Sequence, residues 1–278
     1  MIVVLSWNVL AAPWASPRWY PEGMDAEVLE RGRRVELATA ILQGIPHDLA
    51  CLQETTPPDL ARLRDPRYDV HAADNDASLW SSWSTPEATW EPNGPAVMWR
   101  RDRFVDVETG AFDLGDHGNR AAWIRAREPR RSHTLRVVSV HLDADDRDRR
   151  RAELARLLEW CRPEPGVTDI VAGDLNADTV ATSLAPSGIA DLVAAAGFVD
   201  ALVSVGRRAP THPYARPTDE YASLATIDHV LVRNGTAIDG AVVDSDVWTI
   251  DDPAARLEAT LRRTGSDHLP IVSSIALP

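Results

Sequence analysis

Short apolar runs recur along the chain and predict β-strands, because most of them end at polar or turn-forming residues. The predicted strands cover residues 2–7, 48–53, 95–99, 104–112, 121–127, 135–141, 170–173, 227–232 and 271–275. Three further segments, 27–42, 145–161 and 191–196, are predicted to be helices; in the second, Leu154, Leu157, Leu158 and Cys161 share one face. Strands thus come both in succession and interleaved with helices, which favours two packed sheets with helices outside.

No internal repeat, linker or change of composition interrupts this pattern, so residues 1–278 are interpreted as one domain. Residues 73–93 are predicted to be an irregular loop whose tryptophans, Trp80, Trp83 and Trp90, pack the loop rather than stack on a base. The charged segment 249–266 is expected to be a mobile insertion.

The chain has 42 acidic and 29 basic residues, and every basic one is arginine. A net charge of −13 argues against tight, non-specific binding of long nucleic acid, although carboxylates around a metal would contribute to that charge in a nuclease. Cys51 and Cys161 are expected to be buried, reduced thiols. The opening residues lack an export signal and no run could span a membrane, so we expect a cytoplasmic protein, with no obligate protein partner evident.

Six short segments place polar residues where a predicted strand begins or ends. They are Ser6-Trp7-Asn8, Leu52-Gln53-Glu54, Val140-His141-Leu142-Asp143, Gly173-Asp174-Leu175-Asn176, Thr226-Ile227-Asp228-His229 and Ser266-Asp267-His268-Leu269-Pro270. Each residue alone has an ordinary structural explanation, but if the strands are neighbours these groups converge. Oxygen ligands of this kind suit Mg²⁺, Mn²⁺ or Ca²⁺, and imidazoles beside them suit proton transfer or stabilisation of an oxyanion.

The order of these segments resembles the endonuclease/exonuclease/phosphatase superfamily, the fold of deoxyribonuclease-like enzymes, from Trp7 to Pro270. Its most specific pieces are Glu54, residues 173–176 and residues 266–270, and the opening residues 6–11 look most like the branch with deadenylases, nocturnin and 2′-phosphodiesterases. The resemblance implies a four-layer α/β sandwich with two mostly antiparallel sheets. It also implies metal-dependent hydrolysis of phosphodiester bonds, with RNA or a small nucleotide as the expected substrate.

The same resemblance implies a site for Mg²⁺ or Mn²⁺. Glu54 is the implied principal carboxylate, with help from Asn8 and, directly or through water, from Asp267. Two rival functions stay open: a phosphomonoesterase or cyclic-phosphate phosphatase acting on a small molecule or an RNA end, and an inactive binding or scaffold protein on the same fold.

The resemblance assigns catalytic roles to five further residues. Asp174 and Asn176 would hold the attacking water and the phosphate. His268 would contact the scissile phosphate while Asp228 fixes its tautomer, and His141 would donate a hydrogen bond to a non-bridging oxygen. Either Asp174 or His268 would take the proton of the attacking water.

Other residues carry weaker indications. Arg120 opens a predicted strand and is either a phosphate clamp or a surface arginine. Tyr20 could line the mouth of the site and His212, in a loop, could touch the substrate, whereas His229 is interpreted as structural because it points to the strand face opposite Asp228. The arginines of residues 147–151 are interpreted as a solvated start of a helix.

Overall fold

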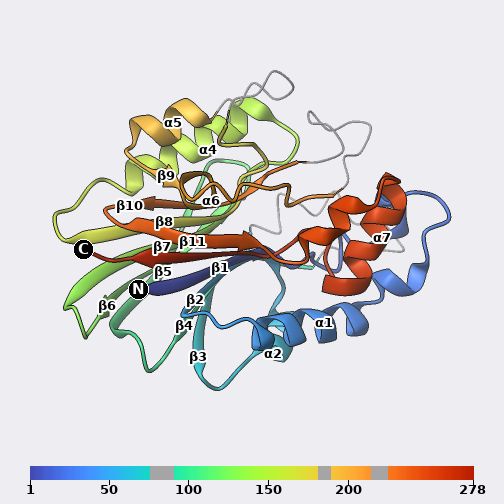
Figure 1. The fold of residues 1–278 in the computed structure, drawn as a ribbon, viewed down its shortest axis with the longest axis horizontal. Helices are drawn as coiled ribbons and strands as arrows, with labels where there is room; N and C mark the ends of the chain where they lie inside the picture. The colour runs from blue at the N-terminus through green and yellow to red at the C-terminus, as the bar shows by residue number, and fades with distance from the viewer. Residues whose placement is uncertain (76–90, 181–188, 214–224) are drawn as a thin grey trace.

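The computed structural model describes residues 1–75, 91–180, 189–213 and 225–278, and its strands form two six-stranded sheets packed face to face (Figure 1). The first sheet has the order β11-β12-β1-β2-β4-β3, and the second has the order β5-β6-β7-β8-β10-β9. Both sheets are mixed and mostly antiparallel. The predicted fold class is therefore confirmed.

The elements have the following bounds. The first sheet contains β1 (Ile2–Asn8), β2 (Leu49–Thr55), β3 (Tyr68–Ala72), β4 (Gly94–Arg100), β11 (Thr236–Val242) and β12 (Ile271–Ala276). The second contains β5 (Val105–Asp113), β6 (Arg120–Glu128), β7 (His133–His141), β8 (Val167–Asp174), β9 (Val199–Asp200) and β10 (Asp228–Arg233). The helices are α1 (Arg31–Gly44), α2 (Pro57–Leu63), α4 (Arg147–Trp160), α5 (Ala190–Ala195), α6 (Ala201–Ser204) and α7 (Pro253–Thr264), with short 3-10 turns η1 (Pro17–Trp19), η2 (Ala26–Leu29) and η4 (Ser245–Thr249).

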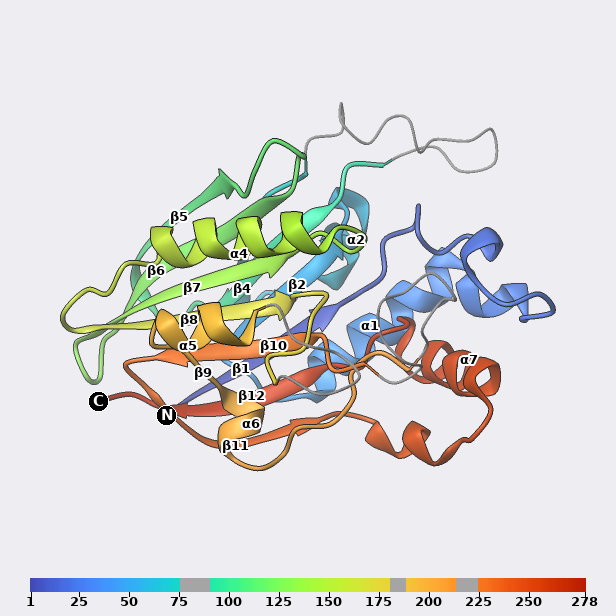
Figure 2. The ribbon, with the colours of Figure 1, turned by 90° about the horizontal axis from the view of Figure 1, so that it is seen from above.

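Three apolar layers hold the sandwich together. Alternate residues of the central strands face the space between the sheets, where Val4 and Cys51 meet Val137 of the opposite sheet. The other residues of β1 and β2 face α1, and those of β7 and β8 face α4 and α5, so that helices cover both outer faces (Figures 1 and 2). Because both faces of the central strands are buried, these strands are apolar along most of their length.

All nine strands predicted from the apolar pattern are present, whereas β3, β9 and β11 were not predicted. The half-exposed strand β3 and the largely exposed β11 lie at the edges of the first sheet and carry no apolar run, and β9 has only two residues. Helix α1 begins at Arg31 rather than at residue 27, because Glu30 accepts hydrogen bonds from the backbone of Gly32 and Arg33 and caps the helix there.

The expectation of a mobile insertion at 249–266 is wrong. Residues Pro253–Thr264 form α7, which begins after the capping residue Asp252 and ends at Gly265 in the left-handed conformation. Leu257 and Leu261 of this helix pack against Leu10, Val28 and Leu29. Proline and glycine mark the two ends of a helix here, not a loop.

Three other expectations concern side chains and chain segments. Cys51 and Cys161 are buried free thiols, as expected, and burial raises the pKa of each to about 12. Arg150, by contrast, is buried, and it donates to the carbonyls of Asp143 and Ala144, so the charge run is not wholly solvated. Residues Trp80, Trp83 and Trp90 lie outside the described residues.

Among the described helices, none is long and apolar enough to cross a membrane.

A buried ion-pair network joins β7, β8 and β10 at the end of the sheet remote from Asp174. The Asp169 carboxylate accepts from Arg136 Nε at 2.7 Å and from Arg233 Nε at 3.0 Å, and all three side chains are buried. We expect Asp169→Ala to lower the free energy of unfolding by about 3–5 kcal/mol, because it leaves two buried guanidinium groups without their carboxylate.

Chemical unfolding of this variant checks the prediction. The control is Glu159→Ala, which removes a solvent-exposed partner of Arg162 and should change stability by less than about 0.5 kcal/mol. Equal, small losses in the two variants would contradict the role of the network.

Candidate active site

Two parallel strand pairs, one in each sheet, bring the predicted site residues to one rim of the sandwich. In the first sheet, β1 pairs with β2 so that Asn8 lies opposite Gln53, the residue before Glu54. In the second, β7 pairs with β8 so that His141 lies opposite Asp174. Because parallel strands end at the same edge, each pair delivers two polar side chains there. The antiparallel strand β10 begins at Asp228, opposite Asp174, and adds a third.

The segment before β12 is fixed to the end of β1 by side-chain hydrogen bonds. Ser266 Oγ donates to the carbonyl of Asn8 at 2.6 Å and accepts from the backbone of His268 at 3.1 Å. Trp7 Nε1 donates to the carbonyl of His268 at 3.0 Å. These contacts place Asp267 and His268 beside the strand ends, so all six polar segments meet at one rim.

Asn8 lies at the centre of this cluster and connects the two sheets. Its Nδ2 donates to Glu54 Oε1 at 3.0 Å and to Asp174 Oδ2 at 3.2 Å, while its Oδ1 accepts from the backbone of Leu10. The second oxygen of Glu54 accepts from the backbone of Ala11 at 2.9 Å. His141 lies over both acids, with Nε2 at 3.5 Å from Asp174 Oδ2 and Nδ1 at 3.9 Å from Glu54 Oε1.

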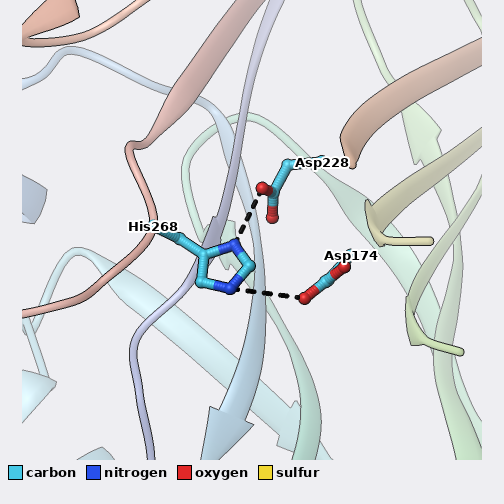
Figure 3. Close-up of side chains that lie close together, drawn as sticks. All are labelled: Asp174, Asp228 and His268. Carbon is cyan, nitrogen blue, oxygen red and sulfur yellow. Dashed lines mark hydrogen bonds and ion pairs between the residues drawn. The ribbon is translucent and has the colours of Figure 1, made fainter. Parts of the chain in front are cut away.

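His268 lies between two buried carboxylates, as Figure 3 shows. Its Nδ1 is 2.9 Å from Asp228 Oδ2 and its Nε2 is 3.6 Å from Asp174 Oδ2. Burial opposes the charged imidazole, but Asp228 and Asp174 outweigh it and raise the pKa of His268 to about 10. Burial also opposes ionisation of Asp174, yet His141 and His268 overcome it and lower the pKa of Asp174. In this arrangement His268 is a cation and Asp174 an anion at neutral pH.

The backbone is strained where these side chains are presented. Glu54 and Asn176 adopt the left-handed conformation, with φ of 55° and 48°, which non-glycine residues adopt at a cost. Asn176 is held there because its backbone donates to Asp174 Oδ1 and its Nδ2 donates to the carbonyl of Leu142. Gly173 is required for close approach, since a Cβ atom at this position would lie 1.9 Å from the carbonyl of Val140.

Asp267 lies at the edge of the cluster and contacts Tyr20 and His212, two residues that carried only weak indications in the sequence. Tyr20 donates from its hydroxyl to Asp267 Oδ2 at 3.0 Å, and His212 Nε2 lies 4.0 Å from the same oxygen. The His212 ring also packs against that of His268, with centroids 4.6 Å apart. Burial, followed by the neighbouring Asp267, raises the pKa of Tyr20 well above its usual value, so the hydroxyl remains a donor.

Thr211, which was not predicted from the sequence, also supports the site. Its hydroxyl accepts from the backbone of Ile227 and Asp228, and its carbonyl accepts from the backbone of Leu269, so it joins the two segments that carry Asp228 and His268. Neither a motif nor a local pattern around Thr211 signals this position. Its role depends on contacts with residues 227, 228 and 269, which lie 16 to 58 positions away in the sequence.

Arg120 and His229 lie apart from the cluster. Arg120 Nε pairs with Asp113 Oδ1 at 3.0 Å on β5, so its predicted role as a phosphate clamp remains a prediction without support from this geometry. His229 points to the other face of β10, as expected, where Nδ1 lies 2.6 Å from Asp200 Oδ2 and Nε2 lies 2.9 Å from the carbonyl of Ala177. There it supports the segment that follows Asp174.

The four site carboxylates have no arginine partner among the ion pairs of the described residues, although other buried acids do. Asp48, Asp59 and Asp169 each pair with arginine. The cluster instead contains Glu54, Asp174, Asp228 and Asp267 with histidines and neutral donors as their neighbours. The His268 cation offsets Asp174 and Asp228, whereas Glu54 and Asp267 accept from neutral donors and need another source of positive charge. The donor set therefore fits a divalent metal ion.

Two groups of residues meet this requirement. In the described part of the chain, Asp174, Asp228 and His268 offer ligand atoms that all lie within 4.8 Å of one another, so this group could hold a metal ion. Glu54, on the other side of Asp174, offers hard oxygen atoms of the kind that Mg²⁺ prefers, whereas Asn8 turns its donor Nδ2 towards the acids and its Oδ1 towards Leu10. Burial and the nearby Asp267 raise the pKa of Glu54, although His141 and hydrogen bonds oppose this.

Comparison with known proteins agrees with the site. The model of the Endonuclease/Exonuclease/phosphatase family matches residues 5–268, so the chain belongs to that family and is a phosphoesterase of its kind. No curated protein matches the sequence.

Solved structures similar to this chain share its fold at low sequence identity. One is a family member from Bacteroides vulgatus, with a TM-score of 0.72 and 16% identity over 100% of this chain and 99% of the other. Another is the mannosyl-6-phosphatase Bt3783 from Bacteroides thetaiotaomicron, with a TM-score of 0.69 and 16% identity over 100% of both chains. The human nocturnin catalytic domain with bound sulfate is also similar, with a TM-score of 0.68 and 20% identity over 100% of this chain and 93% of the other. The resemblance to this superfamily, stated from the motifs, is confirmed, and nocturnin is among the structural neighbours.

The raised pKa of Glu54 leads to a prediction about stability. A carboxyl group whose pKa is raised on folding contributes stability below its unfolded value of about 4.3, and this contribution is lost as the pH rises through the folded pKa. At pH 7.5 the ionised Glu54 therefore costs stability in the metal-free protein. Glutamine has no charge to bury but places an amide donor against Asn8 or the Ala11 backbone, so the test is the pH dependence. We expect the unfolding temperature of metal-free Glu54→Gln to rise relative to the wild type by about 2 °C or more between pH 4 and pH 7.5, which corresponds to roughly 0.5–1 kcal/mol for a chain of this size.

Thermal unfolding in the presence of a chelator measures this difference, which should shrink as the pH is lowered towards 4. Glu108→Gln on β5, where the side chain is exposed, is the matched control and should not change the unfolding temperature. A Glu54→Gln protein whose stability relative to the wild type does not improve between pH 4 and pH 7.5 would refute the electrostatic interpretation.

Proposed function

We propose that this chain is a divalent-metal-dependent phosphodiesterase that hydrolyses RNA or a small nucleotide by in-line attack of water. The observation that carries this proposal is the convergence of polar residues on one rim, where no arginine of the described part of the chain forms an ion pair with the acids. The residues are Asn8, Glu54, His141, Asp174 and His268. A phosphodiester is anionic and resists attack, so its hydrolysis needs a cation, an oriented water and donors for the developing charge.

We assign the metal ion, Mg²⁺ or Mn²⁺, to Glu54 and Asn8, with Asp267 as a direct or water-mediated partner. When bound, the ion would neutralise charge on the phosphate and on the leaving oxygen. Glu54 is fixed for this role, because Asn8 Nδ2 and the backbone of Ala11 each hold one of its oxygens. To ligate the ion, Asn8 would turn its amide so that Oδ1, which here accepts from Leu10, faces the ion in place of Nδ2.

We assign acceptance of the proton from the attacking water to Asp174, because it is a carboxylate anion between His141 and His268, while protonated His268 has no free lone pair to accept a proton. Asn176, whose backbone donates to Asp174 Oδ1, fixes that carboxylate and lies beside it for contact with the phosphate. His268, with its pKa raised to about 10, is protonated and donates from Nε2 to the scissile phosphate, while Asp228 holds Nδ1. His141 donates to a non-bridging oxygen from the other side of Asp174.

The choice of RNA or a nucleotide as substrate is supported by residues 6–11, which resemble the deadenylase branch, and by the net charge of −13. An acidic surface disfavours long duplexes, so a short or terminal substrate fits better. The specific rival is hydrolysis of a phosphomonoester or cyclic phosphate, because a mannosyl-6-phosphatase shares the fold over the full length of both chains.

A substrate panel with Mg²⁺ or Mn²⁺ tests the proposal. It should contain short RNA, single-stranded DNA, dinucleotides, RNA with a cyclic-phosphate end, and a sugar phosphate. The expected products are nucleotides released from RNA or from dinucleotides. Free inorganic phosphate from the sugar phosphate, without cleavage of any diester, would refute the proposal and support the rival.

Single substitutions test the assigned roles. We expect Asp174→Ala and His268→Ala to lower kcat by about 10²–10³-fold or more, because each removes a group that acts on the reacting atoms. Arg162→Ala, at an exposed site remote from the rim, is the control and should retain full activity. Circular dichroism and thermal unfolding show whether the variants keep their fold. Full activity of a folded His268→Ala protein would eliminate its assigned role.

Metal titration distinguishes an inactive scaffold protein from an enzyme. An enzyme with this site should bind Mn²⁺ in calorimetry, and Glu54→Ala should weaken that binding strongly. A wild-type protein that binds neither Mg²⁺ nor Mn²⁺ and hydrolyses no ester in the panel would be a scaffold on the same fold.

A further inference from the structure

Tyr20 is the residue behind Asp267 that the proposed reaction does not use. It lies between β1 and α1, and its hydroxyl donates to Asp267 Oδ2 at 3.0 Å across 247 residues of sequence. Its ring packs against the buried apolar cluster of Leu10, Leu29 and Leu257, and its hydroxyl extends from there to Asp267. The contact thus joins the segment after β1 to the segment before β12.

Arg34 fastens both of these segments to α1. Its Nη1 donates to the carbonyl of Leu10 at 2.6 Å and to that of Gly265 at 3.3 Å, and only 2% of the side chain is exposed. Gly265 approaches so closely that a Cβ atom there would lie 2.4 Å from the Arg34 carbonyl. Because α1 holds both segments in place, Tyr20 and Asp267 meet in a fixed geometry rather than through two loose loops.

The chemistry of the donor matters for a carboxylate that helps to hold a cation. An arginine in this place would satisfy Asp267 but would also cancel its charge. A tyrosine hydroxyl fixes the side-chain orientation and leaves the negative charge available for the metal. Asp267 has no arginine partner among the described ion pairs; its nearest histidine nitrogen, His212 Nε2, lies 4.0 Å away.

We propose that Tyr20 is a positioning residue that sets the affinity of the site for its metal ion by holding Asp267 in one orientation. This inference rests on the proposed function, in which Asp267 contributes to the metal site. Without the hydroxyl, the Asp267 side chain can rotate in the metal-free protein, and this freedom is lost each time the ion binds. The negative charge of Glu54 also repels Asp267 and opposes its rotation back towards the site. The effect therefore falls on metal binding more than on the chemical step.

Calorimetric titration of the metal-free full chain with Mn²⁺ tests this role. Tyr20→Phe removes only the hydroxyl, and we expect the Kd for Mn²⁺ to rise by about 10- to 100-fold, the usual loss when a partner of a metal ligand is removed. The concentration of Mg²⁺ needed for half-maximal activity should rise in parallel, whereas kcat at saturating Mg²⁺ should fall by a much smaller factor.

Tyr68→Phe is the matched control, because Tyr68 also donates a hydrogen bond, at 2.7 Å to the carbonyl of His47, but lies on the edge strand β3. It should leave the Kd for Mn²⁺ unchanged. In an Asp267→Ala background, Tyr20→Phe should cause no further loss of Mn²⁺ affinity, since the two residues act as one unit.

The outcomes separate this inference from the proposed function. If the wild type binds Mn²⁺ and a folded Tyr20→Phe protein binds it equally well, the positioning role is wrong while the metal site stands. A large loss of kcat with an unchanged Kd would also overturn it, because Tyr20 would then act on the chemical step. If the wild type binds no Mn²⁺, the proposed function itself fails.

Discussion

The site depends on one electrostatic constraint: four carboxylates share a largely buried rim and no described arginine pairs with any of them. Elsewhere in the molecule buried acids follow the usual rule, as Asp169 does between Arg136 and Arg233. At the rim, Glu54 and Asp174 are instead held by Asn8, by backbone groups and by histidine. Among the described residues, buried Arg34 lies nearby but forms no ion pair with these acids and donates to backbone carbonyls instead, so their negative charge stays available for a cation.

The fold supplies the rigidity that such a charged cluster requires. Its two central pairs, β1 with β2 and β7 with β8, are parallel, while most other pairs are antiparallel. Each parallel pair needs a crossover helix, and α1 and α4 cover the outer faces of the sheets as they provide it. The apolar packing that stabilises the sandwich therefore also fixes the strand ends. Local strain at Glu54 and Asn176 is tolerated because the surrounding strands hold both residues in place.

Sequence reasoning located the residues whose position follows from strand ends. Asn8, Glu54, His141 and Asp174 end apolar runs, and parallel pairing brings such ends together, so their convergence could be predicted. It did not identify Thr211 or the contact of Tyr20 with Asp267, because these depend on segments that no periodic pattern relates. Residues 249–266 were wrongly predicted to be a mobile insertion because the segment is charged. In the structure Leu257 and Leu261 form the buried side of a helix between Pro253 and Gly265.

The donors around the acids divide the rim into two sides. Glu54 and Asp267 accept from neutral groups, namely Asn8, the Ala11 backbone and Tyr20, so the negative charge of both acids is retained. Asp174 and Asp228 face His268, whose two ring nitrogens both point at carboxylates. An imidazole ligates a metal through a lone pair, and an imidazolium has none to offer. A metal held by Asp174, Asp228 and His268 would therefore have to displace the His268 proton, whereas a metal held by Glu54 would not. Asn8, which donates to both Glu54 and Asp174, sets the separation between the two sides.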